Sequence, residues 1–156
     1  MEKTLKIIDW GLRAYTRALN DQIDLVNAKK EDPSSPDFLI FTEHSPTFTV
    51  GSRTGAEFNL LWDQKTLKDK GIQVHKTNRG GDITYHGPGQ LIIYPIISLY
   101  RRDLADYLRK LEIVIIRALQ SFQIDAGTRE GKTGIWIEDR KICAIGVAVK
   151  SWITYH

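Results

Sequence analysis

A glycine-rich segment from Arg79 to Gln90 combines groups that could bind a small molecule. Its glycines are Gly80, Gly81, Gly87 and Gly89. Glycine permits positive φ and a close approach of a ligand to the main chain, so the segment could wrap a small group and offer it N–H donors. Arg79 adds a positive charge and His86 a titratable ring. The same glycines could instead form two tight turns with His86 facing solvent, and the residue types favour neither interpretation.

A lysine and the single cysteine form a second candidate pair, Lys141 and Cys143. Residues two apart on a strand point to the same face, so the two side chains should lie side by side. A neighbouring ammonium lowers the pKa of a thiol, and the thiolate is the nucleophilic form. The alternative is that Cys143 is a small buried residue of a core strand, and we favour this because unpaired cysteine is among the most buried residue types.

Composition limits the classes of protein that the 156 residues could form. Length and a 42% hydrophobic content indicate one soluble globular domain. One cysteine allows no internal disulfide, and neither a secretory segment nor a membrane-spanning apolar run is present, so we expect a cytoplasmic protein. A net charge of +3 does not demand nucleic acid but would attract an acidic partner. No metal-ligand spacing connects the four histidines and the cysteine, so we expect no metal and no other cofactor.

The first half of the chain alternates helical and strand patterns. Apolar residues at helical spacing predict a helix over residues 11–28, and Gly71 should end a short helix over residues 67–70. A turn should occupy residues 43–46, because the residue before Pro46 is disfavoured from helical geometry. Predicted strands cover residues 38–41, 47–50 and 72–75.

The second half contains the strongest helix signal. Asp103 is placed to cap a helix that runs to Phe122. Before it, the apolar run 91–97 predicts a strand covered on both faces, with Pro95 at an edge or a bulge. After it, residues 134–137 and 141–149 should pair as a hairpin. We therefore predict an α+β domain, with a large mixed sheet of the α/β type and helices packed on it.

The glycine-rich segment also resembles a long family signature. Arg79-Gly80-Gly81, Thr84-Tyr85-His86, Gly89-Gln90 and Tyr94 follow the order found in lipoyl(octanoyl) transferases. The resemblance extends to residues 43–51 and to Gly134-Ile135-Trp136 with the strand from Arg140 to Gly146. It implies the fold of the biotin/lipoate protein ligase catalytic domain. It also implies transfer of an octanoyl group, through an enzyme cysteine thioester, from octanoyl-acyl carrier protein to a lysine of a lipoyl domain, the first step of protein lipoylation.

The resemblance assigns roles residue by residue. Lys141 would be the catalytic lysine. The acyl-binding groove would be lined by Arg79, Gly80, Gly81, Asp82, Ile83, Thr84, Tyr85, His86, Ala144, Ile145 and Gly146. His44, Gln90 and His156 are further candidates from matched or adjacent motifs. The partners would be octanoyl-acyl carrier protein and the lipoyl domains of 2-oxoacid dehydrogenases and of the glycine cleavage H protein. Neither nucleic acid nor a membrane is implied.

The family nucleophile lies in a Pro-Cys-Gly turn downstream of the lysine strand, and the 156 residues contain no such turn. Apolar residues continue to His156, which is unlike a natural domain end. We therefore expect one domain that lacks its C-terminal part and, if complete as given, is inactive. The alternatives are a non-catalytic module that binds the acyl group or the carrier protein, and an ATP-dependent lipoate or biotin ligase.

Overall fold

The computed structural model describes residues 4–156, which separate into two compact units. Residues 4–98 with 146–156 form the first, here called the sheet unit. Residues 99–145 form the second, here called the hairpin unit.

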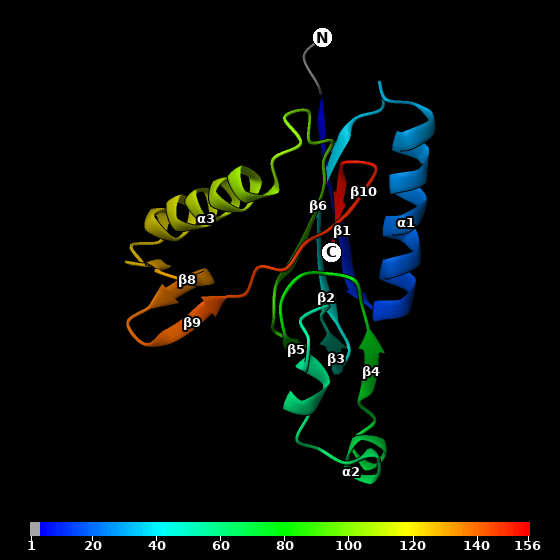
Figure 1. Cartoon of the computed structure of the whole chain (residues 1–156), viewed down its shortest axis with the longest axis vertical. Helices are drawn as coiled ribbons and strands as arrows, with labels where there is room; N and C mark the ends of the chain where they lie inside the picture. The colour runs from blue at the N-terminus through cyan, green and yellow to red at the C-terminus, as the bar shows by residue number, and fades with distance from the viewer. Residues whose placement is uncertain (1–3) are drawn as a thin grey trace. The chain divides into compact units, whose positions relative to one another are not determined.

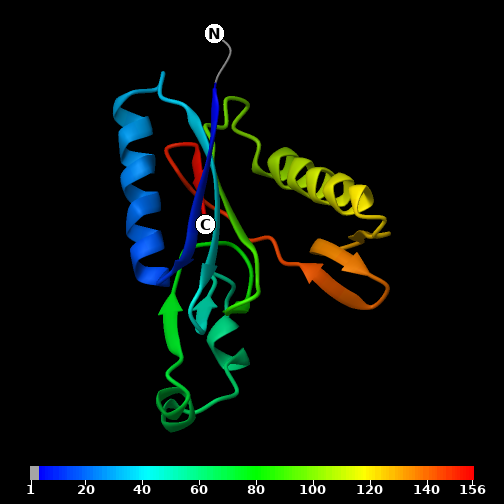
Figure 2. The same cartoon turned by 180° about the vertical axis from the view of Figure 1, so that it is seen from behind.

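The sheet unit is built on three long strands and one helix. Strands β1 (Leu5–Arg13) and β2 (Asp37–His44) pair in parallel, and β6 (Ile92–Ile96) is antiparallel to β2. Helix α1 (Tyr15–Glu31) runs alongside these strands, as Figures 1 and 2 both show. Ala18 and Val26 of α1 join the core that Ile40, Tyr94 and Ile96 form on the sheet.

The C-terminal hairpin completes this core. Strands β10 (Ala148–Lys150) and β11 (Ile153–Tyr155) pair antiparallel, and Ala148, Ile153 and Tyr155 are buried in the same cluster. The Thr154 hydroxyl donates to the Pro95 carbonyl at 2.7 Å, and its N–H donates to the carbonyl of Ile97 at 2.9 Å. These bonds place the end of the chain beside β6.

The helix predicted over residues 11–28 begins later than expected, at Tyr15. Residues 11–13 belong to β1, a strand that the sequence did not predict. The register of β1 against β2 shifts between Asp9 and Leu12, and Gly11 in this gap has φ of +59°. The apolar residue at position 12 fits a helical spacing, but pairing with β2 through Glu43 decides its conformation.

A second, smaller sheet of the same unit carries the glycine-rich segment. Its central strand β3 (Thr47–Val50) is parallel to β4 (Gln73–Lys76) and antiparallel to β5 (Ile83–His86). Between β3 and β4 lie the 3-10 helix η1 (Ala56–Asn59) and the short helix α2 (Gln64–Asp69), which Asp63 caps by accepting from the Thr66 N–H at 2.7 Å. Strand β5 was not predicted, so a third of the segment from Arg79 to Gln90, which was expected to be a loop, is a strand.

The hairpin unit consists of α3 and a three-stranded meander. Asp103 caps α3 (Leu104–Ser121) as predicted, accepting from the N–H of Asp106 at 2.9 Å. Strands β7 (Gly127–Arg129), β8 (Lys132–Ile137) and β9 (Arg140–Cys143) pair antiparallel in sequence order. The predicted hairpin is confirmed, but its second strand ends at Cys143, because residues 148–150 pair with β11 instead.

The α+β class with mixed sheets is confirmed, whereas the single large sheet is not, because the strands of residues 4–156 form four small sheets. Pro95 lies in β6, an edge strand of the β1-β2-β6 sheet. Proline has no N–H, and an edge strand tolerates this because one of its sides pairs with no other strand of the sheet. The strand is not covered on both faces as predicted, since Ile93 is exposed. The predicted turn is shorter than expected, because Glu43 and His44 extend β2.

Candidate active site

Arg79 anchors the glycine-rich segment to the small sheet. Its side chain is almost fully buried, and Nη2 donates to the backbone carbonyl of Thr49 at 2.8 Å and to that of Asp82 at 2.9 Å. Nη2 also donates to the Thr49 hydroxyl at 2.8 Å, and Nη1 donates to the carbonyl of Gly80 at 3.1 Å. Burial lowers the pKa of Arg79, but a guanidinium remains protonated at neutral pH. The predicted charge is therefore present, and it is solvated mainly by backbone carbonyls.

The glycines of the segment pack against glycines from elsewhere in the sheet unit. A Cβ on Gly51 would lie 2.3 Å from the carbonyl oxygen of Gly81, and one on Gly146 would lie 2.6 Å from that of Gly80. Gly81 also has φ of +95°. Of the two interpretations that the sequence left open, close backbone packing thus explains Gly80 and Gly81. The amides of Gly80, Ile83 and Gly89 all donate to other groups of the unit.

The ring of His86 is bonded at both nitrogens. Nδ1 lies 2.8 Å from Oε1 of Gln90, which only accepts, so Nδ1 carries the proton. Nε2 therefore accepts from the Thr49 hydroxyl at 3.1 Å, and that hydroxyl accepts in turn from Arg79. Burial lowers the pKa of His86 to about 4, with smaller contributions from His44 and Arg79. His86 is neutral at pH 7 and holds one end of a directional chain of hydrogen bonds.

His44 is held in the same way. Its Nδ1 donates to the backbone carbonyl of Arg13 at 2.7 Å, so Nε2 accepts from the Tyr94 hydroxyl at 2.7 Å. The ring is fully buried, and burial lowers its pKa. It meets the His86 ring edge to face with centroids 5.9 Å apart. Neither histidine has an unbonded lone pair, so neither is placed to take a proton without losing a hydrogen bond.

His156 and Tyr15 extend this aromatic cluster. The His156 N–H donates to Gln22 at 2.8 Å, and its ring stacks on Tyr15 with centroids 6.2 Å apart. Burial, aided by the charge of Arg79, lowers the pKa of His156 to about 4. Burial raises the pKa of Tyr15, which the sequence offered only as one member of a helical stripe. No residue-type signal distinguishes Tyr15 from a core residue, so the sequence could not have found it.

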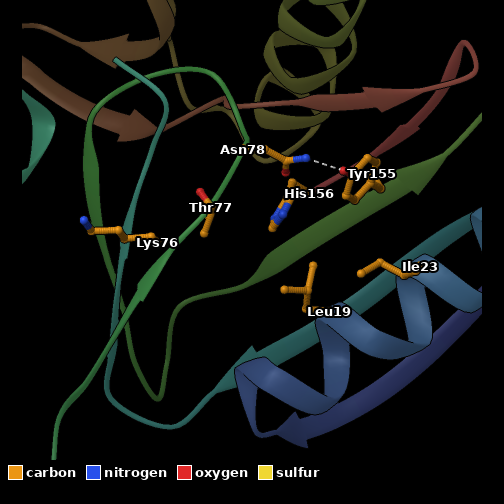
Figure 3. A pocket seen from close by; sticks show the side chains of 7 residues that line it. All are labelled: Leu19, Ile23, Lys76, Thr77, Asn78, Tyr155 and His156. Atoms are coloured by element: carbon orange, nitrogen blue, oxygen red, sulfur yellow. Dashed lines mark hydrogen bonds between the residues drawn. The ribbon is translucent and has the colours of Figure 1, made fainter. Parts of the chain in front are cut away.

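A cavity of about 340 Å³ opens beside this cluster (Figure 3). Leu19 and Ile23 of α1 form its apolar wall, and Asn78 donates a hydrogen bond to the Tyr155 hydroxyl across its polar side. The remaining lining residues are Lys76, Thr77 and His156. Of the predicted site residues, only His156 lines the cavity, while the segment from Arg79 onward follows directly from Asn78.

The other residues of the predicted groove lie on or beside β5. The Asp82 carboxylate accepts from Asn59 at 2.8 Å, which holds the pKa of that carboxyl below its usual value, and it faces Arg53 at 3.3 Å. Ile83 and Thr84 pair with β3. Tyr85 is partly exposed and packs on Phe48 with ring centroids 5.2 Å apart.

Lys141, Ala144 and Ile145 belong to the hairpin unit. Lys141 is exposed on β9, and its Nζ donates to the carbonyl of Thr133 at 3.2 Å and lies 4.9 Å from the ring centroid of Trp136. Burial raises the pKa of the Cys143 thiol, and the nearby Lys141 offsets this only in part. A raised pKa disfavours the thiolate, so Cys143 fits a packing residue better than a nucleophile.

Comparison with known proteins decides the family. A model of the lipoyl protein ligase A/B catalytic domain matches residues 15–156. An octanoyltransferase of Flavobacterium psychrophilum is 39% identical, over 100% of this chain and 74% of its own length. Another from Bacteroides fragilis is 42% identical, over 95% and 72%. The chain belongs to the octanoyltransferase family. A third octanoyltransferase, from Nostoc punctiforme, is 44% identical, over 94% of this chain and 63% of its own length.

Solved structures confirm the fold. A bipartite lipoate protein ligase of Thermoplasma acidophilum aligns with 99% of this octanoyltransferase-family chain at a TM-score of 0.77 and 20% identity, covering 60% of that chain. A lipoate-protein ligase A bound with ATP aligns with 99% at a TM-score of 0.70 and 19% identity, covering 64%. The α+β fold is thus that of the lipoate ligase catalytic domain.

None of the helices described in residues 4–156 is long and apolar enough to cross a membrane. Within the same residues, no three His, Cys, Asp or Glu side chains gather closely enough to hold a metal ion.

Proposed function

We propose that this chain holds the acyl group in an octanoyltransferase. The enzyme would move an octanoyl group from acyl carrier protein to a lysine of a lipoyl domain. The match to the lipoyl protein ligase A/B catalytic domain over residues 15–156 is the observation that carries the proposal, and an open cavity between α1 and residues 76–78 offers a place for the acyl chain. Asn78, which lines the cavity, directly precedes the segment that matches the family signature.

The cavity suits the two ends of an octanoyl thioester. Leu19 and Ile23 offer apolar contacts to a hydrocarbon chain, and each buried methylene contributes roughly 0.8 kcal/mol. Asn78, Thr77 and His156 provide polar groups at the same cavity, where a thioester carbonyl could be oriented. The anchored segment from Arg79 to His86 would keep residues 76–78 in place.

Proton transfer is proposed for Lys141. His44 and His86 are neutral and bonded at both ring nitrogens, which leaves them suited to orienting the site. Lys141 is exposed, and its amine has one hydrogen-bond acceptor, the carbonyl of Thr133. In the role that the family resemblance gives it, Lys141 would accept a proton from the attacking group and return one to the leaving thiol.

The enzyme thioester is proposed to form on a cysteine other than Cys143, in the Pro-Cys-Gly turn of the family. The donor would be octanoyl-acyl carrier protein. The acceptors would be lipoyl domains of 2-oxoacid dehydrogenases and of the glycine cleavage H protein, in the cytoplasm. Acyl carrier protein is acidic, and the net charge of +3 would speed their encounter.

Intact mass spectrometry tests the proposal. The 156-residue chain, and in parallel a relative that contains the Pro-Cys-Gly turn, is mixed with octanoyl-acyl carrier protein and a lipoyl domain, once with and once without ATP. We expect an octanoylated lipoyl domain only with the relative, and saturable binding of octanoyl-acyl carrier protein by both. A stable octanoyl adduct on Cys143, or transfer that requires ATP, would contradict the proposed chemistry.

A further inference from the structure

Helix α3 contains a buried carboxylate, Glu112, which the proposed function does not use. The side chain is 2% exposed, while the apolar residues beside it on the helix, Ile113 and Val114, are exposed. Glutamate is rarely buried unless its charge is paired and its oxygens are hydrogen-bonded. The contacts of Glu112 therefore indicate why a carboxylate occupies this position.

Each carboxylate oxygen of Glu112 has a separate partner. Oε2 accepts from Nη1 of Arg109, one turn earlier on α3, at 2.8 Å. The guanidinium of Arg109 is 70% exposed, so this partner remains largely in water. Oε1 accepts from the backbone N–H of Gly134 on β8 at 3.2 Å, and that bond is buried. This bond joins the Glu112 carboxylate of α3 to a main-chain amide of β8.

The side chain of Lys141, on β9, lies over the backbone of β8 at Gly134. The φ of Gly134 is +120°, and a Cβ there would lie 2.6 Å from the Cys143 carbonyl oxygen. The same Cβ would lie 3.3 Å from Cε and 3.5 Å from Cδ of Lys141. The alkyl chain of Lys141 therefore passes over a residue without a side chain, and the backbone of Gly134 forms the surface beneath it.

The amine of Lys141 is directed by the neighbours of Gly134. The residue before it, Thr133, supplies the carbonyl that accepts from Nζ at 3.2 Å. Two residues after it, Trp136 supplies the ring that Nζ approaches at 4.9 Å. Between Ile135 and Trp136 the register against β9 shifts, so the strand ladder alone holds this stretch less firmly. The bond from Gly134 to Glu112 fixes it from the helix side.

We propose that Glu112 is a positioning residue for Lys141. Its carboxylate fixes the amide of Gly134, and Gly134 with Thr133 and Trp136 sets the direction of the Lys141 amine. The consequence for catalysis rests on the proposed function, in which Lys141 transfers protons. The geometric part concerns the hairpin unit only and can be tested without any transfer reaction.

The test uses the whole chain labelled with 13C at lysine Cε. The Trp136 ring should shift the Hε signal of Lys141 upfield, and loss of that signal in Lys141→Arg assigns it. Glu112→Met keeps length and helix propensity but removes the acceptor, and Glu112→Gln keeps an acceptor without charge. We expect the signal to move to the position of an exposed lysine in Glu112→Met and to stay in Glu112→Gln. Asp106→Asn, which removes a carboxylate that pairs with Lys110 on the same helix, should also leave it in place.

An unchanged Lys141 signal in a folded Glu112→Met variant would overturn the proposal. Should that variant fail to fold, Glu112→Asp replaces it in the test, because the shorter side chain cannot reach Gly134 in the same geometry. An unchanged Lys141 signal in Glu112→Asp would likewise overturn the proposal. In a relative that is active, the equivalent of Glu112→Met should lower kcat by about 100-fold with little change in KM. Loss of rate without movement of the lysine signal would point to a structural role, and absence of transfer in every variant would count against the proposed function only.

Discussion

The guanidinium of Arg79 should be the main support of the segment from Gly80 to His86, and replacing it by methionine tests this. Methionine retains an apolar stem of similar length but donates to none of the four acceptor atoms that Arg79 serves. At about 1 kcal/mol for each lost hydrogen bond, the free energy of unfolding should fall by about 4 kcal/mol. A loss of this size exceeds that of most single substitutions and is typical of breaking a buried hydrogen-bond network.

Urea unfolding at pH 7, followed by circular dichroism, measures the change in unfolding free energy. The matched control is Arg53→Met, because Arg53 also contacts Asp82 but is 70% exposed and should contribute less than about 0.5 kcal/mol. Removal of the Arg79 charge should also raise the pKa of His86, which that charge lowers. A loss below about 1 kcal/mol for Arg79→Met, or equal losses for the two variants, would refute the role assigned to the guanidinium.

Three further outcomes are expected. Gly51→Ala would place a Cβ 2.3 Å from the carbonyl oxygen of Gly81 and should destabilise the chain by about 2 kcal/mol in urea unfolding, whereas Gly127→Ala meets no atom within 4 Å and should cost less than about 1 kcal/mol. The pKa of His86 is about 4 when folded and about 6.5 when unfolded, so its contribution to stability is complete above pH 6.5 and is lost as the pH falls toward 4, by up to about 1.4 kcal/mol per unit. His86→Gln should remove the uptake of one proton that accompanies unfolding between pH 6.5 and 4, so the free energy of unfolding should depend less steeply on pH. An unchanged slope would show that the ring is not neutral in the fold. Leu19→Ser should weaken binding of octanoyl-acyl carrier protein about tenfold by calorimetry, while Leu12→Ser, exposed on β1 outside the cavity, should not; equal weakening by both would exclude the cavity as the acyl site.

Local signals in the sequence were sufficient for several elements. Asp103 and the apolar spacing after it define α3 because capping and helical periodicity are properties of neighbouring residues. Strand β3 and the end of α2 before Gly71 follow from turn and cap chemistry in the same way. The family was also evident from the sequence, because the order of residues from Arg79 to Tyr94 is long and specific.

Tertiary pairing determined what local signals could not. The segment from Leu5 to Arg13 is a strand because β2 pairs with it, and β5 forms because β3 lies alongside. In the described part of the chain, four small sheets replace the single sheet expected from the sequence. The residue at which a strand leaves one partner for another depends on contacts with distant parts of the chain.

At the candidate site, the sequence determined the residue types and the structure determined their roles. Arg79 and His86 were predicted to serve a ligand-binding segment, but the fold brings Thr49 to both of them and uses their polar atoms to hold the main chain. Tyr15 joins the cluster only because α1 packs beside the C-terminal hairpin. The sequence by itself therefore determined the family, its catalytic lysine candidate and the principal helices. Only the tertiary structure decided which polar groups of the candidate site are hydrogen-bonded internally, because hydrogen-bond partners and burial are properties of the packed chain.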